Sequence, residues 1–230
     1  LLLSVIGVGA LSSCSDYLES DKFFKDRMTL EESFKTKPYA EKWLAHAFSD
    51  LVEINADVAS KGYTPHCFAD DMYYGDRDVD YDMKEKGALS YNRFRLGEYN
   101  ENEKQGGWER CYRGIRNATI FIHNIYLNQE MSEVEIADYR GQARFVRAYY
   151  YWLLLRKYGP VPILPDEGID YTESYDDIAT PRSTYEECAE YISKEMVLAA
   201  KELKPGRRDD ALSSARPTQG AALAASAKVR

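Results

Sequence analysis

Residues 68–99 hold the side chains of this sequence that are best suited to binding chemistry. Aromatic rings are interspersed there with carboxylates, an amide and guanidinium groups. A ring can stack on the apolar C–H face of a sugar, while the polar groups can hydrogen-bond to its hydroxyls. The segment is therefore predicted to carry a ligand surface. The contact residues we expect are Asp71, Tyr73, Tyr74, Arg77, Tyr81, Tyr91, Asn92 and Arg93, with Asp76 as another polar group and Phe68, Phe94 and Tyr99 as further rings.

The surroundings of this segment predict a long irregular excursion. Glycine and proline interrupt residues 59–107 so often that no helical period survives. Loops of this length inside a compact domain are uncommon and frequently functional, because a rigid scaffold can hold binding groups on its connections. The alternative is that the rings cover the scaffold beneath the loop, since loop aromatics are commonly packed.

The sequence gives little support for a bound metal ion or cofactor. Aspartates alternate at 76, 78, 80 and 82, but an EF-hand would need Gly where Tyr81 stands and Glu where Gly87 stands. A solvated acidic loop is the favoured interpretation, with irregular calcium binding as the alternative. Cys67, Cys111 and Cys188 show no metal-ligand spacing, and Cys111 and Cys188 fit buried helical stripes. We predict no metal site and no cofactor.

The sequence also argues against two functional classes. A formal charge of −8 and the lack of a basic stripe disfavour nucleic-acid binding. No nucleophile elbow, zincin, P-loop or dinucleotide fingerprint is present. A glycoside hydrolase would need two carboxylates at a fixed separation, which one sequence cannot place. The sequence thus argues against the enzyme classes that carry these fingerprints, while a glycoside hydrolase stays an alternative that glycan turnover would distinguish.

The first residues predict export and lipidation. Residues 1–11 are apolar and uncharged, which is typical of a signal-peptide core. Leu11-Ser-Ser-Cys14 is similar to a lipobox, so Cys14 is predicted to be acylated and to anchor the protein to a membrane. The expected organisation is a signal segment at 1–13, a lipidated tether at 14–37 and a helical domain at 38–230.

The rest of the chain predicts a mostly α fold. Apolar residues at spacings of three and four favour helices at 39–58 and 108–127. Capping-box pairs at Ser132/Glu135 and Ser183/Glu186 are predicted to start two more, ending near Tyr158 and Leu203. A last helix should begin near Thr218.

Helical spacing also assigns roles to the conspicuous side chains of the 132–158 helix. Two apolar stripes predict that this helix is buried on more than one side. The tyrosines at 112 and 149–151, with Trp152, are expected in the core. Arg144 and Arg147 are expected on the helix surface, paired with carboxylates of a neighbouring helix.

Two runs of residues resemble the SusD/RagB family. Trp108-Glu-Arg-Cys-Tyr112-Arg-Gly-Ile115 is similar to its W-x-x-x-Y-x-x-I helix. The run from Ala143-Arg-Phe-Val-Arg-Ala148 through Tyr158-Gly-Pro-Val-Pro162 resembles its A-R-F-x-R-A…Y-G-x-V-P signature, although Gln142 stands where Glu is expected. The start Cys14-Ser-Asp-Tyr-Leu18 and the small-residue run 217–223 fit the same pattern.

This resemblance implies both a fold and a role. The expected fold is a scaffold of tetratricopeptide-like helix pairs, of which this chain lacks the C-terminal half. The expected role is a lipid-anchored outer-membrane protein, facing the cell exterior, that is not an enzyme but captures oligosaccharide and passes it to a SusC-type TonB-dependent transporter. The alternatives are a peptide-binding member of the family and a helical-repeat scaffold lipoprotein.

Overall fold

A computed structural model describes residues 29–51, 107–166, 179–207 and 216–229. Within these ranges every regular element is a helix, which confirms the predicted mostly α fold. The elements are α2 (Leu30–Phe34), α3 (Lys37–Phe48), α6 (Trp108–Asn124), the 3-10 turn η3 (Ile125–Leu127), α7 (Glu133–Tyr158), α9 (Tyr185–Glu202) and α10 (Gln219–Val229).

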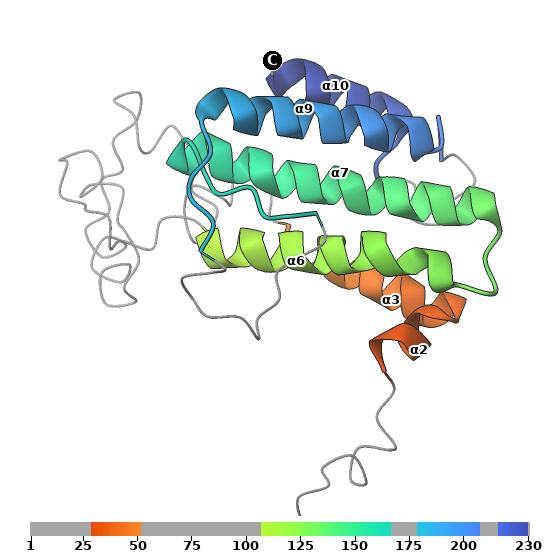
Figure 1. The fold of residues 1–230 in the computed structure, drawn as a ribbon. Helices are drawn as coiled ribbons and strands as arrows, with labels where there is room; N and C mark the ends of the chain where they lie inside the picture. Colours follow the sequence, from red (N-terminus) through yellow and green to blue (C-terminus); the bar gives the residue numbers. More distant parts are fainter. Residues whose placement is uncertain (1–28, 52–106, 167–178, 208–215, 230) are drawn as a thin grey trace, which may run out of the picture.

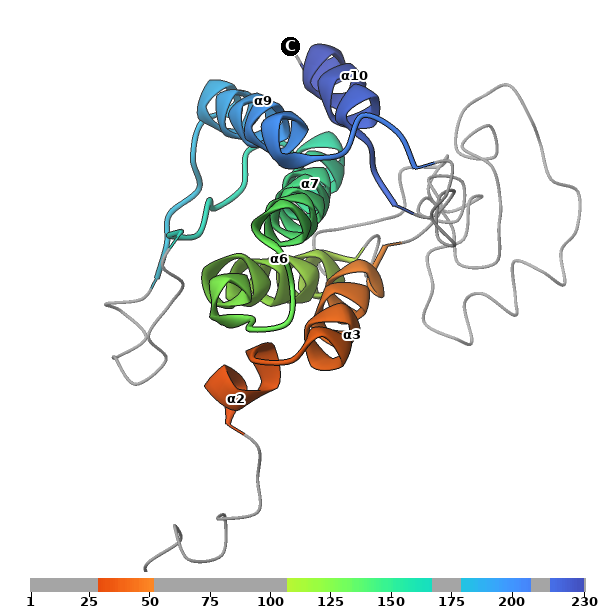
Figure 2. The same cartoon turned by 90° about the vertical axis from the view of Figure 1, so that its right-hand side faces the viewer.

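Helix α7 is the axis of the bundle (Figure 1). It packs against α6 on one side and α9 on the other, so the prediction that it is buried on more than one side is confirmed. Helix α3 packs along α6, α2 packs against α3 and η3, and α10 packs along α9. The view down the bundle in Figure 2 separates these layers. Helix α6 passes into α7 through η3, where the N–H of Asn128 donates to the carbonyl of Ile125 at 3.1 Å.

Capping boxes start three of the helices. Ser132 and Glu135 form the predicted pair at α7. The pair predicted from Ser183 and Glu186 is wrong, because Thr184 and Glu187 form it instead. The N–H of Ser183 donates to the carbonyl of Val161 at 3.2 Å, which keeps Ser183 in the extended segment before the helix.

Helix α3 begins and ends earlier in the sequence than predicted. Pro38 lies in its first turn, as expected, but the helix begins at Lys37 and ends at Phe48. The prediction placed its end at residue 58, and residues 52–58 lie outside the described ranges.

Helix α2 was missed by the sequence pattern, and it occupies the last part of the segment predicted as a tether. Thr29 and Glu32 form its capping box. The buried ring of Phe34 lies 5.5 Å from that of Trp43 and 5.7 Å from that of Phe121, measured between centroids. Five residues are too few to show a helical period, and the contacts that stabilise them come from distant parts of the chain.

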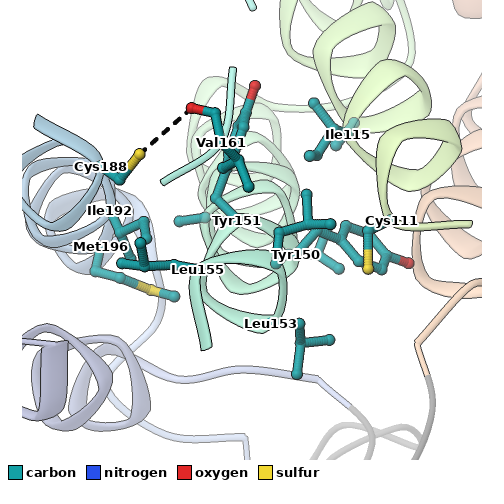
Figure 3. Close-up of a cluster of buried hydrophobic side chains, with 14 of the residues drawn as sticks. Cys111, Ile115, Tyr150, Tyr151, Leu153, Leu155, Val161, Cys188, Ile192 and Met196 are labelled. Atoms are coloured by element: carbon teal, nitrogen blue, oxygen red, sulfur yellow. Dashed lines mark hydrogen bonds between the residues drawn. The ribbon is translucent and has the colours of Figure 1, made fainter. Parts of the chain in front are cut away.

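The core gathers around the C-terminal half of α7 (Figure 3). Tyr150 and Tyr151 are buried there, as predicted, whereas Tyr149 and Trp152 are only partly covered. Cys111 and Cys188 pack as small apolar groups, also as predicted. The Cys188 thiol donates to the carbonyl of Val161 at 3.5 Å, which ties α9 to the segment after α7.

Charged groups are buried between α7 and α9. Both Arg144 and Arg147 donate to Glu195, with Nη–Oε distances of 3.2 and 2.7 Å, so the predicted pairing is confirmed. Their placement on the helix surface is wrong for Arg147, whose side chain is only 2% exposed. Periodicity could not reveal this, because α7 is covered on both sides.

Candidate functional site

The residues predicted to contact a ligand lie outside the described ranges. This holds for the whole set from Asp71 to Arg93, for the alternating aspartates and for Cys14. The structure therefore brings none of them together and separates none of them. It does describe the helix ends that precede and follow residues 52–106 in the chain, namely the end of α3 and the start of α6.

An ion pair joins these two ends. Asp50, just after α3, accepts hydrogen bonds from Nε and Nη2 of Arg113 at 3.0 and 2.5 Å. The Asp50 side chain is 8% exposed, whereas that of Arg113 is 58% exposed. The hydrogen bond to Asp50 raises the pKa of the Arg113 guanidinium above its ordinary value. This contact fixes the end of α3 against the second turn of α6.

Tyr150 of α7 also contacts the end of α3. The hydroxyl of Tyr150 donates to the carbonyl of Ala47 in the last turn of α3, at 2.8 Å. That carbonyl is one of those that a helix end leaves without an intrahelical partner. Burial raises the pKa of Tyr150, so its hydroxyl keeps the proton that this bond requires.

An aromatic cluster marks the start of α6. The ring of Trp108 lies 5.0 Å from that of Tyr112 and 5.1 Å from that of Tyr158, the last residue of α7. The guanidinium of Arg182 lies over the Trp108 ring, 5.3 Å from its centroid. All these residues lie at the left-hand end of the bundle in Figure 1, where α6 and α9 begin and α7 ends.

Hydrogen bonds from this cluster hold the extended segment that follows α7. Tyr112 donates its hydroxyl to the carbonyl of Pro162 at 2.8 Å, and the amide of Leu164 donates to the Tyr151 hydroxyl at 3.0 Å. Burial raises the pKa of Tyr112 above its ordinary value and that of Tyr151 to about 12. Both hydroxyls therefore act here as neutral hydrogen-bonding groups.

The described residues thus offer a rigid frame. The polar groups named above are engaged in an ion pair, a contact between a guanidinium and a ring, and hydrogen bonds of neutral hydroxyls. No group of three or more His, Cys, Asp or Glu residues that could hold a metal ion occurs within the described ranges. No helix in the same ranges is long and apolar enough to cross a membrane.

Sequence reasoning missed several members of this frame. Asp50, Arg113 and Arg182 drew no attention because each acts through a partner far away in the chain, and spacing along one helix cannot reveal such pairs. Trp108 and Tyr112 were visible as part of the family motif and of a helical stripe. Their contacts with Tyr158 and Pro162 explain why aromatic residues occur at these positions.

The SusD-like family, described as "Starch-binding associating with outer membrane", matches this chain over residues 63–230. The match includes the whole described bundle from α6 onwards. No curated protein matches the chain.

Solved structures with the same fold come from the same group of proteins. A SusD-like protein from Bacteroides fragilis superposes with a TM-score of 0.64 at 20% identity, over 91% of this chain and 36% of its own. A surface glycan-binding protein A from Bacteroides uniformis gives 0.61 at 21% identity, over 84% and 41%. A laminarin-binding SusD-like protein gives 0.66 at 18% identity, over 85% and 40%. The present chain thus spans less than half the length of these proteins.

Proposed function

Because this chain belongs to the SusD-like family, we propose that the protein captures glycans at the cell surface without degrading them. The observation that carries the proposal is the family match, which extends over residues 63–230 and concerns starch-binding proteins associated with the outer membrane. Two of the structural neighbours are named for binding a glycan, one of them laminarin.

The proposed ligand surface is the segment that precedes α6. Its rings and polar groups, from Asp71 to Arg93, would stack on sugar faces and hydrogen-bond to hydroxyls. The described frame supports this assignment, because Asp50, Arg113 and Trp108 hold the flanking helix ends firmly. A binding segment gains affinity when a rigid scaffold limits the ordering cost of capture.

The proposed setting is the outer membrane. Acylation of Cys14 would attach the protein there through several acyl chains, in line with the family's association with that membrane. In a Cys14→Ser variant we expect the protein to leave the membrane fraction while its fold persists. Retention of this variant in the membrane fraction would contradict lipid anchoring at Cys14.

The proposed partner is a SusC-type TonB-dependent transporter, which would receive the captured glycan. Affinity purification of the complete protein from its own outer membrane, followed by mass spectrometry, tests this. An outer-membrane transporter should be recovered in stoichiometric amount. Recovery of periplasmic or cytoplasmic assembly factors in its place would favour the scaffold function.

Glycan capture is tested on an array with the complete protein, expressed without lipid from Ser15 onwards. We expect binding to one class of polysaccharide, with no shortening of the bound chains after prolonged incubation. Shortening of those chains would contradict the non-catalytic role. Binding of peptides in place of glycans would show that the protein captures peptides, as in the peptide-binding alternative.

A further inference from the structure

Helix α10 turns its smaller residues towards α9, along which it lies in Figure 1 and in Figure 2. Its buried residues are Ala222 and Ser226, whereas Leu223 stays 49% exposed. A rotation of α10 by one residue position, about 100°, would bury Leu223 in place of Ala222. Burying a leucine side chain stabilises a protein by about 1.5–3 kcal/mol. Apolar burial against α9 would therefore favour the rotated helix, and it does not explain the orientation that the structure shows.

Polar contacts with α9 do explain it. The hydroxyl of Ser226 is buried 2.9 Å from the Ser193 hydroxyl and 3.3 Å from the Ser193 carbonyl. At the start of α10, Gln219 donates its N–H to the carbonyl of Lys204 at 3.0 Å and its side-chain amide to that of Ala200 at 3.2 Å. We infer that these polar contacts, together with a buried ion pair before α10, set the rotation and register of α10 on α9.

The buried ion pair joins Arg207, which follows α9, to Asp138 of α7. Nη2 of Arg207 donates to Oδ1 of Asp138 at 2.6 Å, and the two side chains are 2% and 1% exposed. Nε of Arg207 donates to the carbonyl of Pro217 at 2.8 Å, two residues before α10 begins. One guanidinium therefore fixes the point from which α10 starts relative to α7.

The carboxylate of Asp138 is held by further donors. Its Oδ1 also accepts from the N–H of Lys204 at 3.0 Å, and its Oδ2 accepts from Nε2 of Gln142 at 2.9 Å. A buried ion pair contributes little net stability, because desolvation offsets the attraction, and its best-established role is to select one arrangement among several. Such selection matters for α10, because apolar residues occupy positions 221–225 in succession and so lie on every side of the helix.

The orientation of α10 can be measured as a distance between two nitroxide labels by double electron–electron resonance. The labels are attached at Lys194→Cys in α9 and Ala227→Cys in α10, two exposed positions. The complete protein is used without its lipid and with Cys67→Ser. The two thiols of the core are too buried to take up label in the folded protein.

Two variants remove the polar contacts. Ser226→Ala deletes the hydroxyl pair with a residue that favours helix, and Asp138→Asn/Arg207→Met deletes the ion pair without leaving a charge unpaired. A combined variant carries all three changes. The controls are Leu223→Ala, which shortens the exposed apolar side chain, and Arg113→Met, which breaks the ion pair between α6 and the end of α3.

We expect one narrow distance in wild type and in both controls. Each separate variant should broaden the distribution, and the combined variant should add a second distance that differs by about 5 Å, as a rotation of about 100° displaces a side chain around a helix. A single unchanged distance in the combined variant would overturn the inference, and so would a second distance in either control. If circular dichroism shows that the combined variant is unfolded, the separate variants decide, and unchanged distributions in both would overturn the inference.

Discussion

The ring of Tyr150 lies so close to the backbone of Gly114 that a β-carbon at position 114 would stand 2.3 Å from Cε2 of that ring. The absence of a side chain at Gly114 therefore lets α6 and α7 approach each other. It also lets the Tyr150 hydroxyl reach the carbonyl of Ala47 beyond them. This one contact sets the distance between the two helices that carry the aromatic frame.

Replacing Gly114 with Ala should destabilise the bundle strongly. The new methyl group would clash with a fully buried ring, and overpacking of this kind costs about 1–3 kcal/mol, the upper end being expected here. Urea unfolding followed by circular dichroism measures the change.

The control for this variant is Gly220→Ala in α10. The nearest atom to a β-carbon there is Oγ1 of Thr218 at 4.0 Å, so the added methyl group is accommodated. Alanine is favoured over glycine inside helices by about 1 kcal/mol at most, and the control should be neutral or slightly stabilising. Equal stability losses in the two variants would contradict the packing described for Gly114.

Glu135 should make stability depend on pH. The hydrogen bond from Lys37, followed by those from Ser132, lowers its pKa from 4.5 to about 2. A carboxylate with a lowered pKa stabilises the folded state above its ordinary pKa, and this contribution is lost as pH falls from 4.5 towards 2. Glu135→Gln should therefore be less stable than wild type at pH 7, with the gap closing as pH falls towards 3.

The corresponding control is Glu190→Gln, which changes an exposed carboxylate on α9 that makes no ion pair among the described residues. Its stability difference from wild type over the same range gives the baseline for an exposed carboxylate. A Glu135→Gln gap that changes with pH no more than this baseline would show that the contact with Lys37 contributes nothing.

Substitutions of the buried charged residues between α7 and α9 should lower the stability of the protein by different amounts. Glu195→Leu would remove the carboxylate that the two guanidinium groups share, leaving Arg147 with Asp166 and Arg144 with Glu202. The loss should therefore be at most the about 3–5 kcal/mol that breaking a buried pair costs. Arg147→Leu would leave Glu195 still bound by Arg144, so its cost should be smaller. Urea unfolding of both variants at pH 7 measures this order, and the reverse order would contradict the shared role of Glu195.

The thiols of Cys111 and Cys188 should resist labelling in the folded protein. Their residues are 4% and 1% exposed, and a thiol must reach solvent as thiolate to react. In a protein with Cys14 and Cys67 changed to Ser, we expect iodoacetamide to modify neither thiol until urea unfolds the chain. Rapid labelling under native conditions would contradict their place in the core.

Sequence reasoning predicted the long helices well because their periodicity and caps agree. α6 with η3 covers the predicted 108–127, and α7 ends at Tyr158, directly before Gly159, whose φ is 67°. A positive φ favours glycine, so the stop signal has a direct physical cause.

The errors arose where distant contacts decide between local alternatives. The pairs Ser183/Glu186 and Thr184/Glu187 fit the capping pattern equally well, and the bond from Ser183 to Val161 selects the second. The helical pattern predicted Arg147 to lie on the surface. It is buried because α9 packs against α7 there and provides Glu195 as its partner.

The sequence predicted which residues could contact a ligand, but it did not predict the residue pairs that fix the flanking helix ends. Rings and polar groups between Asp71 and Arg93 are visible in any reading of the sequence, and their assignment as ligand contacts stays a prediction. The supports come from Asp50 with Arg113 and from Trp108 with Arg182, pairs that lie more than sixty residues apart. Only a fold can bring such residues together.

Isothermal titration calorimetry on the complete protein tests the proposed glycan capture most directly. Wild type is titrated with an oligosaccharide of the class selected on the array, beside Tyr73→Ala/Tyr74→Ala and a control, Tyr126→Ala, changed on the exposed ring of η3. The account predicts binding by wild type and the control, with at least about fivefold weaker binding by the double variant, since stacked rings contribute about 0.5–1.5 kcal/mol each. Equal affinity in all three proteins would contradict the proposed ligand surface, and no binding by wild type would contradict glycan capture itself.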